Sequence, residues 1–199
     1  MERFIRGGVF VLCLAPFVWT VYAAVTGGLG PDPAEALMHV TGEWSLRILA
    51  LTLLISPLRA WTGWTVLMKL RRMLGLYAFF YACIHLLSFL QFFIGWTPAA
   101  LLEELAERPY ITVGFGAWLL MLPLAITSTR GMQRRLRRNW QRLHRLVYPA
   151  AVLACLHLLW QARSDIGEAL VYIAVFAVLL GWRLRRRYRR QRAPAVARV

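Results

Sequence analysis

Residues 71–95 read RRMLGLYAFFYACIHLLSFLQFFIG, and this stretch decides the class of fold. After the two arginines, residues 73–94 contain no Asp, Glu, Lys or Arg. An α-helix rises about 1.5 Å per residue, so a segment of this length covers about 30 Å of hydrocarbon. We therefore predict a membrane-spanning helix that carries one histidine, His85, within it.

Five further apolar segments flank this one, and together they predict an all-α integral membrane protein, a six-transmembrane-helix bundle. Hydrophobic residues make up 59% of the 199 residues, more than is usual in a soluble domain. The spans take up most of the chain, so we expect a single membrane domain over residues 1–199, and no repeat at a fixed period is evident. The expected spans are residues 7–26, 43–58, 73–94, 110–127, 146–160 and 166–182.

The formal net charge of +15 is distributed between the spans in a pattern that predicts orientation. With both termini cytoplasmic, 21 of 24 Lys and Arg residues fall in cytoplasmic segments, the exceptions being Arg47, Arg108 and Arg163. Eight of the nine acids then fall on the outer side, as the positive-inside rule favours. Residues 183–199 become a basic cytoplasmic tail that contacts anionic lipid headgroups. The basic runs lack a fold to present them to nucleic acid, so no nucleic-acid partner is expected.

Two histidines are expected at one depth of the membrane. His85 lies 13 residues beyond Arg72 and His157 lies 12 residues beyond Arg145, on two spans that both run outward. Both side chains should therefore sit about 18–20 Å from the inner boundary. Neutral imidazole is a common iron ligand, and burial favours the neutral form, so the pair suits the axial positions of a haem. The alternative is that each histidine only forms hydrogen bonds between helices.

The other two histidines, His144 and His39, are expected to lie elsewhere. His144 precedes His157 by 13 residues, about 20 Å along a helix, so it cannot serve the same haem. It could belong to a second haem or another redox site near the cytoplasmic face, with a ligand other than histidine. The alternative is an interfacial residue that binds headgroups or caps backbone. His39 is expected in a solvated outer loop.

Several short motifs together resemble a known family. They are TGEWSLR (41–47), RRMLGL (71–76), HL (85–86), RPYIT (108–112), TST (127–129), WQRLH (140–144) and HLLW (157–160). Over residues 41–182 the chain resembles MsrQ (YedZ), the haem-binding membrane subunits of bacterial periplasmic protein-methionine-sulfoxide reductases. That family belongs with the ferric-reductase-like transmembrane domains. One departure is Arg137, where relatives commonly have glycine, and it concerns the local turn of an inner loop.

The resemblance implies cofactors and partners that composition could not show. It implies haem b and FMN, electrons from the respiratory quinone pool, and a location as a multi-pass protein of the bacterial inner membrane. It also implies a heterodimer with a periplasmic molybdopterin-containing catalytic subunit that repairs methionine sulfoxide in oxidised envelope proteins. By motif, His85, His144 and His157 are the haem-associated histidines, whereas no residue is assigned to FMN.

The predicted role is therefore that of an electron-transfer subunit, not of the catalytic subunit itself. No Gly-rich phosphate-binding loop follows a strand in this chain, so NAD(P)H oxidation by that route is not expected. Two alternatives stay open at this point. One is a ferric- or cytochrome b561-like transmembrane reductase with another acceptor. The other is a non-redox transporter or assembly factor, in which the histidines are packing or proton-relay groups.

Overall fold

The structure, a computed structural model, describes residues 2–162 and 166–192. Within these ranges the chain is helical and contains no β-strand, which confirms the all-α prediction. Arg163, Asp165 and residues 193–199, which the sequence assigned to sides of the membrane, lie outside the described residues. In chain order the elements are α1 (Glu2–Thr26), α2 (Pro33–Thr62), α3 (Val66–Phe89), the π-helix η1 (Leu90–Ile94), α4 (Pro98–Glu107), α5 (Pro109–Ile126), α6 (Arg130–Leu143), the 3-10 helix η2 (His144–Leu146), α7 (Val147–Gln161) and α8 (Ile166–Arg192).

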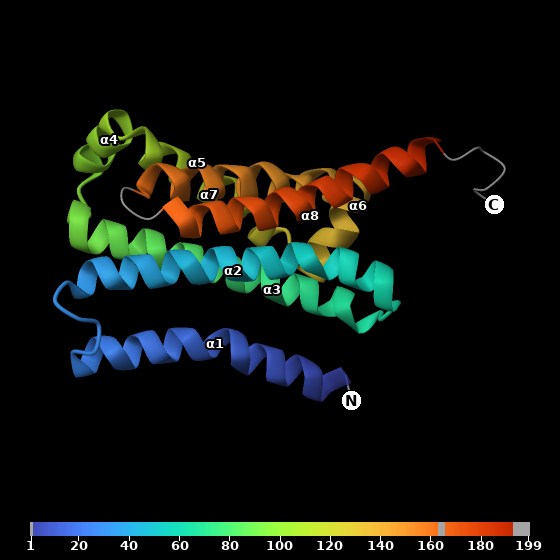
Figure 1. The fold of residues 1–199 in the computed structure, drawn as a ribbon, viewed down its shortest axis with the longest axis horizontal. Coiled ribbons are helices and arrows are strands. Elements are labelled where there is room, and N and C mark those ends of the chain that lie inside the picture. Colours follow the sequence, from blue (N-terminus) through green and yellow to red (C-terminus); the bar gives the residue numbers. More distant parts are fainter. Residues whose placement is uncertain (1, 163–165, 193–199) are drawn as a thin grey trace.

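The long helices run side by side, and the chain passes back and forth along one axis (Figure 1). The start of α1 and the end of α8 lie at the same end of the bundle, together with the α2–α3 turn and α6. We call this the basic end, because Lys and Arg are concentrated in its segments 59–72, 130–145 and 183–192. The acidic end is the opposite one, which holds the α1–α2 connection and α4. α4 carries three acidic residues, Glu103, Glu104 and Glu107, at this end.

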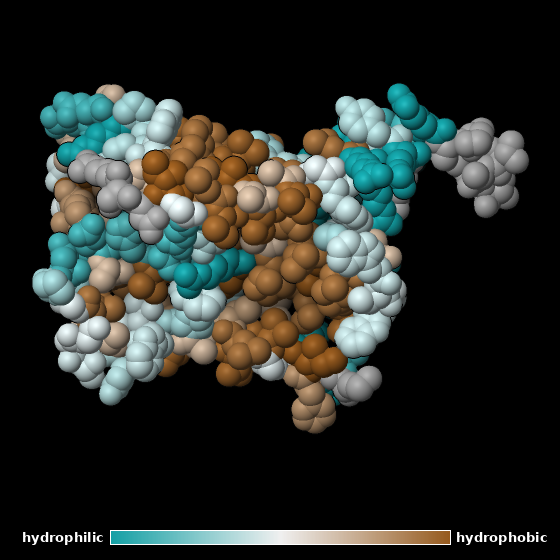
Figure 2. Space-filling view, viewed as in Figure 1, coloured by the Kyte–Doolittle hydropathy of each residue, from teal (hydrophilic) through white to brown (hydrophobic). Residues whose placement is uncertain are grey.

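Five helical segments of the described chain are long and apolar enough to cross a membrane. On the face shown in Figure 2, apolar side chains form a broad band between more hydrophilic ends. That distribution is typical of a protein whose middle faces lipid. The chain is thus a multi-pass integral membrane protein. The five segments are Glu2–Thr26, Val66–Ile94, Pro109–Ile126, Arg130–Gln161 and Ile166–Arg189.

The expected second span, residues 43–58, is not among these five segments. It lies within α2, a 30-residue helix that packs against α1, α3 and α8. Glu43, Arg47 and Arg59 reduce the apolar character of α2. Arg47 donates to the Glu43 carboxylate at 2.7 Å and to the Tyr172 hydroxyl at 3.0 Å, so its charge is paired within the bundle. Five spans, and not six, therefore meet the criterion of length and hydropathy.

α2 also begins ten residues earlier than the expected span. Asp32 caps the helix, its carboxylate accepting a hydrogen bond from the Glu35 N–H at 2.9 Å, and Pro33 opens the first turn. His39 is consequently a helical residue, exposed and 3.6 Å from Glu35, so its placement in a loop was wrong.

An internal repeat relates two antiparallel helix pairs, α2 with α3 and α5 with α7. The sequence ACIHLL at residues 82–87 recurs as ACLHLL at residues 154–159, an offset of 72 residues. α2 lies along α3, and α5 lies along α7, so each copy of the motif faces an equivalent neighbour helix. The expectation that the chain has no repeat is therefore wrong. A six-residue match separated by 72 positions is a weak signal in the sequence alone. The equivalent packing of the two helix pairs makes the repeat recognisable.

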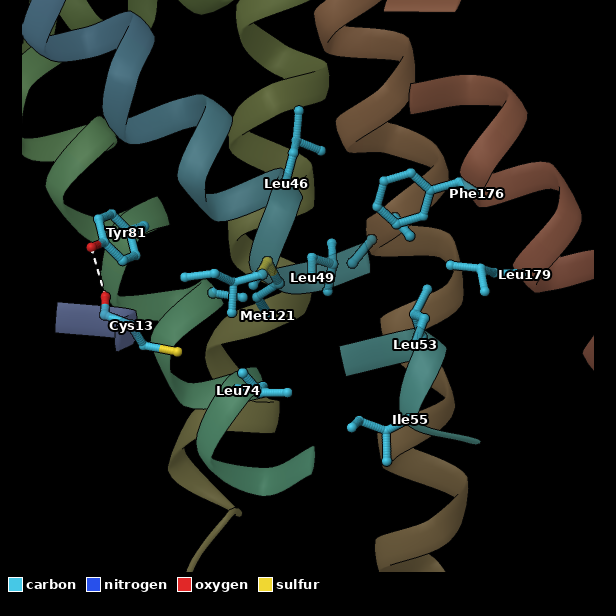
Figure 3. Close-up of a cluster of buried hydrophobic side chains, with 14 of the residues drawn as sticks. Cys13, Leu46, Leu49, Leu53, Ile55, Leu74, Tyr81, Met121, Phe176 and Leu179 are labelled. Atoms are coloured by element: carbon cyan, nitrogen blue, oxygen red, sulfur yellow. Dashed lines mark hydrogen bonds between the residues drawn. The ribbon is translucent and has the colours of Figure 1, made fainter. Parts of the chain in front are cut away.

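α1 packs against α2 and α3 at one side of the bundle (Figure 1), and Tyr81 of α3 fastens it there. The buried Tyr81 hydroxyl donates to the Cys13 carbonyl at 2.8 Å (Figure 3). It also accepts from the Phe17 N–H at 3.0 Å. These two backbone groups are the partners of a regular i to i−4 helix bond. The hydroxyl therefore bridges a backbone carbonyl and a backbone N–H of α1 next to Pro16, where a bend in the helix is expected.

α6 is kinked at Arg137. This residue has φ 47° and ψ −117°, which is not a helical conformation, between two helical segments. A positive φ of this kind favours glycine, because a Cβ atom crowds the backbone there. Glycine would therefore suit this kink better than arginine does.

Candidate functional site

The structure brings His85 and His157 together between the two helix pairs. His85 comes from α3 and His157 from α7, and their ring centroids lie 6.2 Å apart with the ring planes at 79°. His157 lies four residues before Gln161, the last residue of α7, and His85 lies nine residues before Ile94. The pair is therefore nearer to the acidic end than to the basic end. The expectation of one shared depth agrees with this geometry.

Each imidazole is anchored to the neighbouring helix through its Nδ1 atom. His85 Nδ1 lies 2.8 Å from the Met38 carbonyl oxygen on α2, and His157 Nδ1 lies 2.7 Å from the Tyr110 carbonyl oxygen on α5. A carbonyl only accepts, so each Nδ1 must carry the proton and donate it. The neutral ring then has its lone pair on Nε2. No protein partner of either Nε2 is found among the residues that the structure describes.

A glycine on each neighbouring helix lets the imidazole approach the backbone. A Cβ placed on Gly42 would lie 3.0 Å from His85 Nδ1, and one placed on Gly114 would lie 2.7 Å from His157 Nδ1. Gly42 and Gly114 are 72 residues apart, as are Met38 and Tyr110, and His85 and His157. The repeat therefore includes the histidine, its backbone acceptor and the glycine beside it. Both halves of the site are built in the same way.

The donor set fits a metal held between two imidazoles. Metal–imidazole bonds are about 2 Å long, so two rings on opposite sides of one ion have centres about 6 Å apart, once the ring size is included. The observed 6.2 Å agrees with that spacing. A backbone acceptor on the second ring nitrogen is also typical of ligating histidines, since it fixes the tautomer and the ring orientation. Both rings are only partly buried by protein, which leaves surface for a cofactor to cover.

His144 lies in a different setting, at the basic end. Its Nε2 is 3.2 Å from the Thr127 hydroxyl oxygen, which itself donates to the Pro123 carbonyl at 2.6 Å. The Thr127 hydroxyl therefore gives its only proton to the Pro123 carbonyl, and it must accept a hydrogen bond from the Nε2–H of His144. Trp140 stacks on the His144 ring with centroids 3.9 Å apart. The repeat places Arg72 at the position equivalent to His144, so no second histidine pair forms among the described residues.

Residues 41–155 match the family described as ferric reductase like transmembrane component. A protein-methionine-sulfoxide reductase heme-binding subunit MsrQ from Xanthomonas axonopodis pv. citri is 53% identical over 166 residues, which cover 83% of this chain and 76% of that protein. The chain belongs to the MsrQ family. An MsrQ of the same description from Rhodospirillum rubrum is 47% identical over 195 residues, covering 96% of this chain and 93% of that protein.

The resemblance drawn from the motifs is therefore confirmed. An MsrQ from Xanthomonas euvesicatoria pv. vesicatoria is 51% identical over 177 residues, covering 89% of this chain and 81% of that protein. No solved structure matches the chain significantly. The match to the ferric-reductase-like family includes His85 and ends two residues before His157.

Four residues of the site were missed by sequence reasoning, namely Met38, Gly42, Tyr110 and Gly114. Met38 and Tyr110 contribute only carbonyl oxygens, which every residue has, so side-chain chemistry gave no signal. The two glycines could have been found from the repeat. Aligning ACIHLL with ACLHLL sets the offset of 72, and that offset superimposes Gly42 on Gly114.

Proposed function

We propose that this MsrQ-family chain is a haem b-binding electron-transfer subunit in which His85 and His157 are the axial ligands. The observation that carries this proposal is the pair of imidazoles with centres 6.2 Å apart, each fixed through Nδ1 with Nε2 free. The relatives are named heme-binding subunits, and this name supports the same assignment. Haem, when bound, supplies a one-electron centre whose potential depends on axial ligands and surroundings.

The protein's own contribution is to hold two imidazoles in fixed orientations. The carbonyls of Met38 and Tyr110 keep the proton on Nδ1 and direct Nε2 away from the helix backbone. Gly42 and Gly114 allow the rings to lie against α2 and α5 without displacing those helices. α3, α5 and α7, which contribute to the site, are each part of a segment long and apolar enough to cross a membrane, so a cofactor held there would lie in largely apolar surroundings.

We propose one haem, with His144 at a separate position near the basic end. Thr127 and Trp140 occupy the Nε2 atom and one ring face of His144, and Arg72 stands at the equivalent repeat position. His144 would then act at an inner redox site, at the side where a quinone or FMN donor would deliver electrons. The quinone pool and FMN are proposed from the family resemblance alone.

The acceptor is proposed to be a periplasmic molybdopterin-containing catalytic subunit that reduces methionine sulfoxide in envelope proteins. The relatives' name, a heme-binding subunit of a protein-methionine-sulfoxide reductase, supports such a partner. The histidine pair is nearer to the acidic end, so electrons would leave the chain on that side. Docking would involve the acidic segments 27–43 and 94–109.

We propose that α2 is a sixth span and that both termini are cytoplasmic in a bacterial inner membrane. α2 has 30 residues, about 45 Å of helix, and so is long enough to cross about 30 Å of hydrocarbon. The start of α1 and the end of α8 share the basic end, which supports a common side for both termini. The membrane unit is a single domain, followed by a basic tail over residues 183–199.

Visible spectra of the detergent-purified chain test the ligand assignment. We expect a Soret band that is lost or strongly shifted in His85→Ala and in His157→Ala. His144→Ala is the matched control, and it should keep the wild-type ratio of haem to protein. A wild-type spectrum in both ligand variants would rule out the axial pair. A halved haem content in His144→Ala would rule out the single haem.

The match to the ferric-reductase-like family favours one alternative, a transmembrane reductase with another acceptor. Co-purification with the catalytic subunit, followed by anaerobic mixing of the reduced complex with methionine sulfoxide, distinguishes the two. Reoxidation of the haem that requires the catalytic subunit supports the proposed partner. Reoxidation by ferric chelates alone, with no complex formed, supports the alternative.

A further inference from the structure

A cavity lined by arginines lies at the basic end, where α2, α3, α7 and α8 meet. Its volume is about 480 Å³, and its walls include Ser56, Arg71, Tyr148, Trp182, Arg183 and Arg186. Arg71 comes from α3, whereas Arg183, Arg186 and a further lining residue, Arg187, come from the C-terminal part of α8. The cavity is separate from the histidine pair, which lies toward the acidic end.

Arg183 is held rigidly at the inner wall of this cavity. Its guanidinium donates to the Tyr148 hydroxyl at 2.9 Å, to the Leu53 carbonyl at 2.8 Å and to the Ser56 hydroxyl at 2.9 Å. All three partners are neutral, so none of them balances its charge. The Nε atom is buried and has no partner in the described part of the chain. A buried donor left unpaired is rare in native proteins, and a bound anion or water is one way to satisfy it.

The charge of the cavity is likewise unbalanced. Arg71 is close enough to Arg183 for the two charges to repel each other, and both side chains are partly buried. Across residues 2–162 and 166–192, the four ion pairs found are all elsewhere. They are Glu35 with His39, Glu43 with Arg47, Glu2 with Lys69, and Glu104 with Arg108. Partly buried like charges without a counter-ion are unfavourable, so this site favours an anion.

The chemistry of the walls suits a phosphate group. Guanidinium groups present parallel N–H donors that match the oxygens of a phosphate, and Arg183 is already oriented by its three neutral contacts. Trp182 and Tyr148 add aromatic surface, and the Arg186 guanidinium lies 5.2 Å from the Trp182 ring. Aromatic and basic residues at the end of a membrane helix are typical of the headgroup region.

We propose that this cavity binds a phosphate group, carried either by an anionic phospholipid of the adjacent leaflet or by a soluble phosphate ester. This site is independent of the proposed haem function and would be present in haem-free protein. Arg71 and Arg183 contact the phosphate directly, whereas Ser56 and Tyr148 position Arg183.

Binding of short-chain phosphatidylglycerol to the full chain in detergent, followed by native mass spectrometry, tests the site. Loss of one charged hydrogen-bond donor lowers affinity by about tenfold or more, which is expected for Arg71→Gln and for Arg183→Gln. Arg185→Gln is the matched control, because it removes the same charge from the same helix outside this cavity. Unlike Arg183, Arg71 forms no hydrogen bond to another helix within the described residues, so Arg71→Gln should fold even if Arg183→Gln does not.

Competition identifies the source of the phosphate. If bound phosphatidylglycerol is not displaced by excess glycerol phosphate or FMN, the ligand is a lipid. If either soluble ester displaces it, the ligand is soluble. Both results support the site. Equal weakening in Arg71→Gln, Arg183→Gln and Arg185→Gln would show diffuse attraction to the basic end and overturn the proposal. Absence of binding by all three probes to the wild-type chain would overturn it as well.

Discussion

A single methyl group at Gly114 should disrupt the site more than any other glycine-to-alanine change in the bundle. The added Cβ would lie 2.7 Å from His157 Nδ1 and 2.8 Å from Cε1, whereas ordinary contact begins at 3.4 Å. The ring would have to retreat by about 0.7 Å, which is the difference between these distances. Such a shift breaks the 2.7 Å bond from Nδ1 to the Tyr110 carbonyl. The imidazole then loses both its orientation and its fixed tautomer.

Loss of an outer hydrogen bond to a metal ligand typically lowers metal affinity by 10- to 100-fold, roughly 1.4–2.7 kcal/mol, and we expect an effect of this order for Gly114→Ala. Gly42→Ala should have a smaller effect, since its Cβ would lie 3.0 Å from His85 Nδ1. Gly116→Ala is the matched control two residues away on α5, where the nearest atom is Leu153 Cδ1 at 3.6 Å. That variant should bind haem normally and gain up to about 1 kcal/mol of helix stability.

The assay is titration of haem into haem-free protein, followed by the Soret absorbance, with helix content checked by circular dichroism. The expected order of affinity is wild type and Gly116→Ala, then Gly42→Ala, then Gly114→Ala. Wild-type affinity in Gly114→Ala, in a folded protein, would refute the steric reasoning. Equal losses in Gly114→Ala and Gly116→Ala would refute it too, because helix perturbation and not ring contact would then be responsible.

Three further predictions concern the ligand planes, α6 and α1. The two imidazole planes lie at 79° to each other. The ferric haem protein should therefore give the strongly anisotropic low-spin EPR signal of near-perpendicular axial ligands. A rhombic signal, typical of parallel ligands, would contradict this geometry. Arg137→Gly should raise the unfolding free energy by about 1–3 kcal/mol through relief of the positive φ, whereas Arg138→Gly should lower it by about 1 kcal/mol in the same denaturation assay. Tyr81→Phe should lower the free energy of unfolding by about 1–3 kcal/mol and leave the haem content unchanged. Tyr77 is the control, because its 3.2 Å bond to the Phe10 carbonyl is exposed. An equal loss of unfolding free energy in Tyr77→Phe would argue against the role of Tyr81.

The depth of the two histidines could be predicted because helix rise is constant and the flanking arginines mark the membrane boundary. Counting residues from Arg72 and Arg145 was enough to bring His85 and His157 together. Their hydrogen-bond partners could not be predicted in this way, because backbone carbonyls leave no trace in residue identity. Finding them required the packing of α2 on α3 and of α5 on α7.

The second helix shows where hydropathy and charge counting give different answers. Arg47 and Glu43 count against a span in any sum over residues, but in the folded chain they bind each other and Tyr172. Sequence alone does not show that a charge is paired, so the same residues suggest a loop, a surface helix or a span. The start of α2 was misplaced because the expected span was bounded by hydropathy, whereas Asp32 and Pro33 begin the helix outside the apolar segment.

The 72-residue repeat has a consequence for assembly of the protein. Each antiparallel helix pair carries one imidazole, one glycine and one carbonyl acceptor, so neither pair alone can ligate the iron on both sides. A bound haem would therefore bridge the two helix pairs. Its affinity for the protein would depend on how closely the two pairs pack against each other. By mass action, bound haem would further stabilise the state in which the two pairs are joined. Two separately expressed halves, divided within the α4 region, already share the bonds of Arg183 to Leu53 and Ser56, and would be expected to associate more tightly when haem is available.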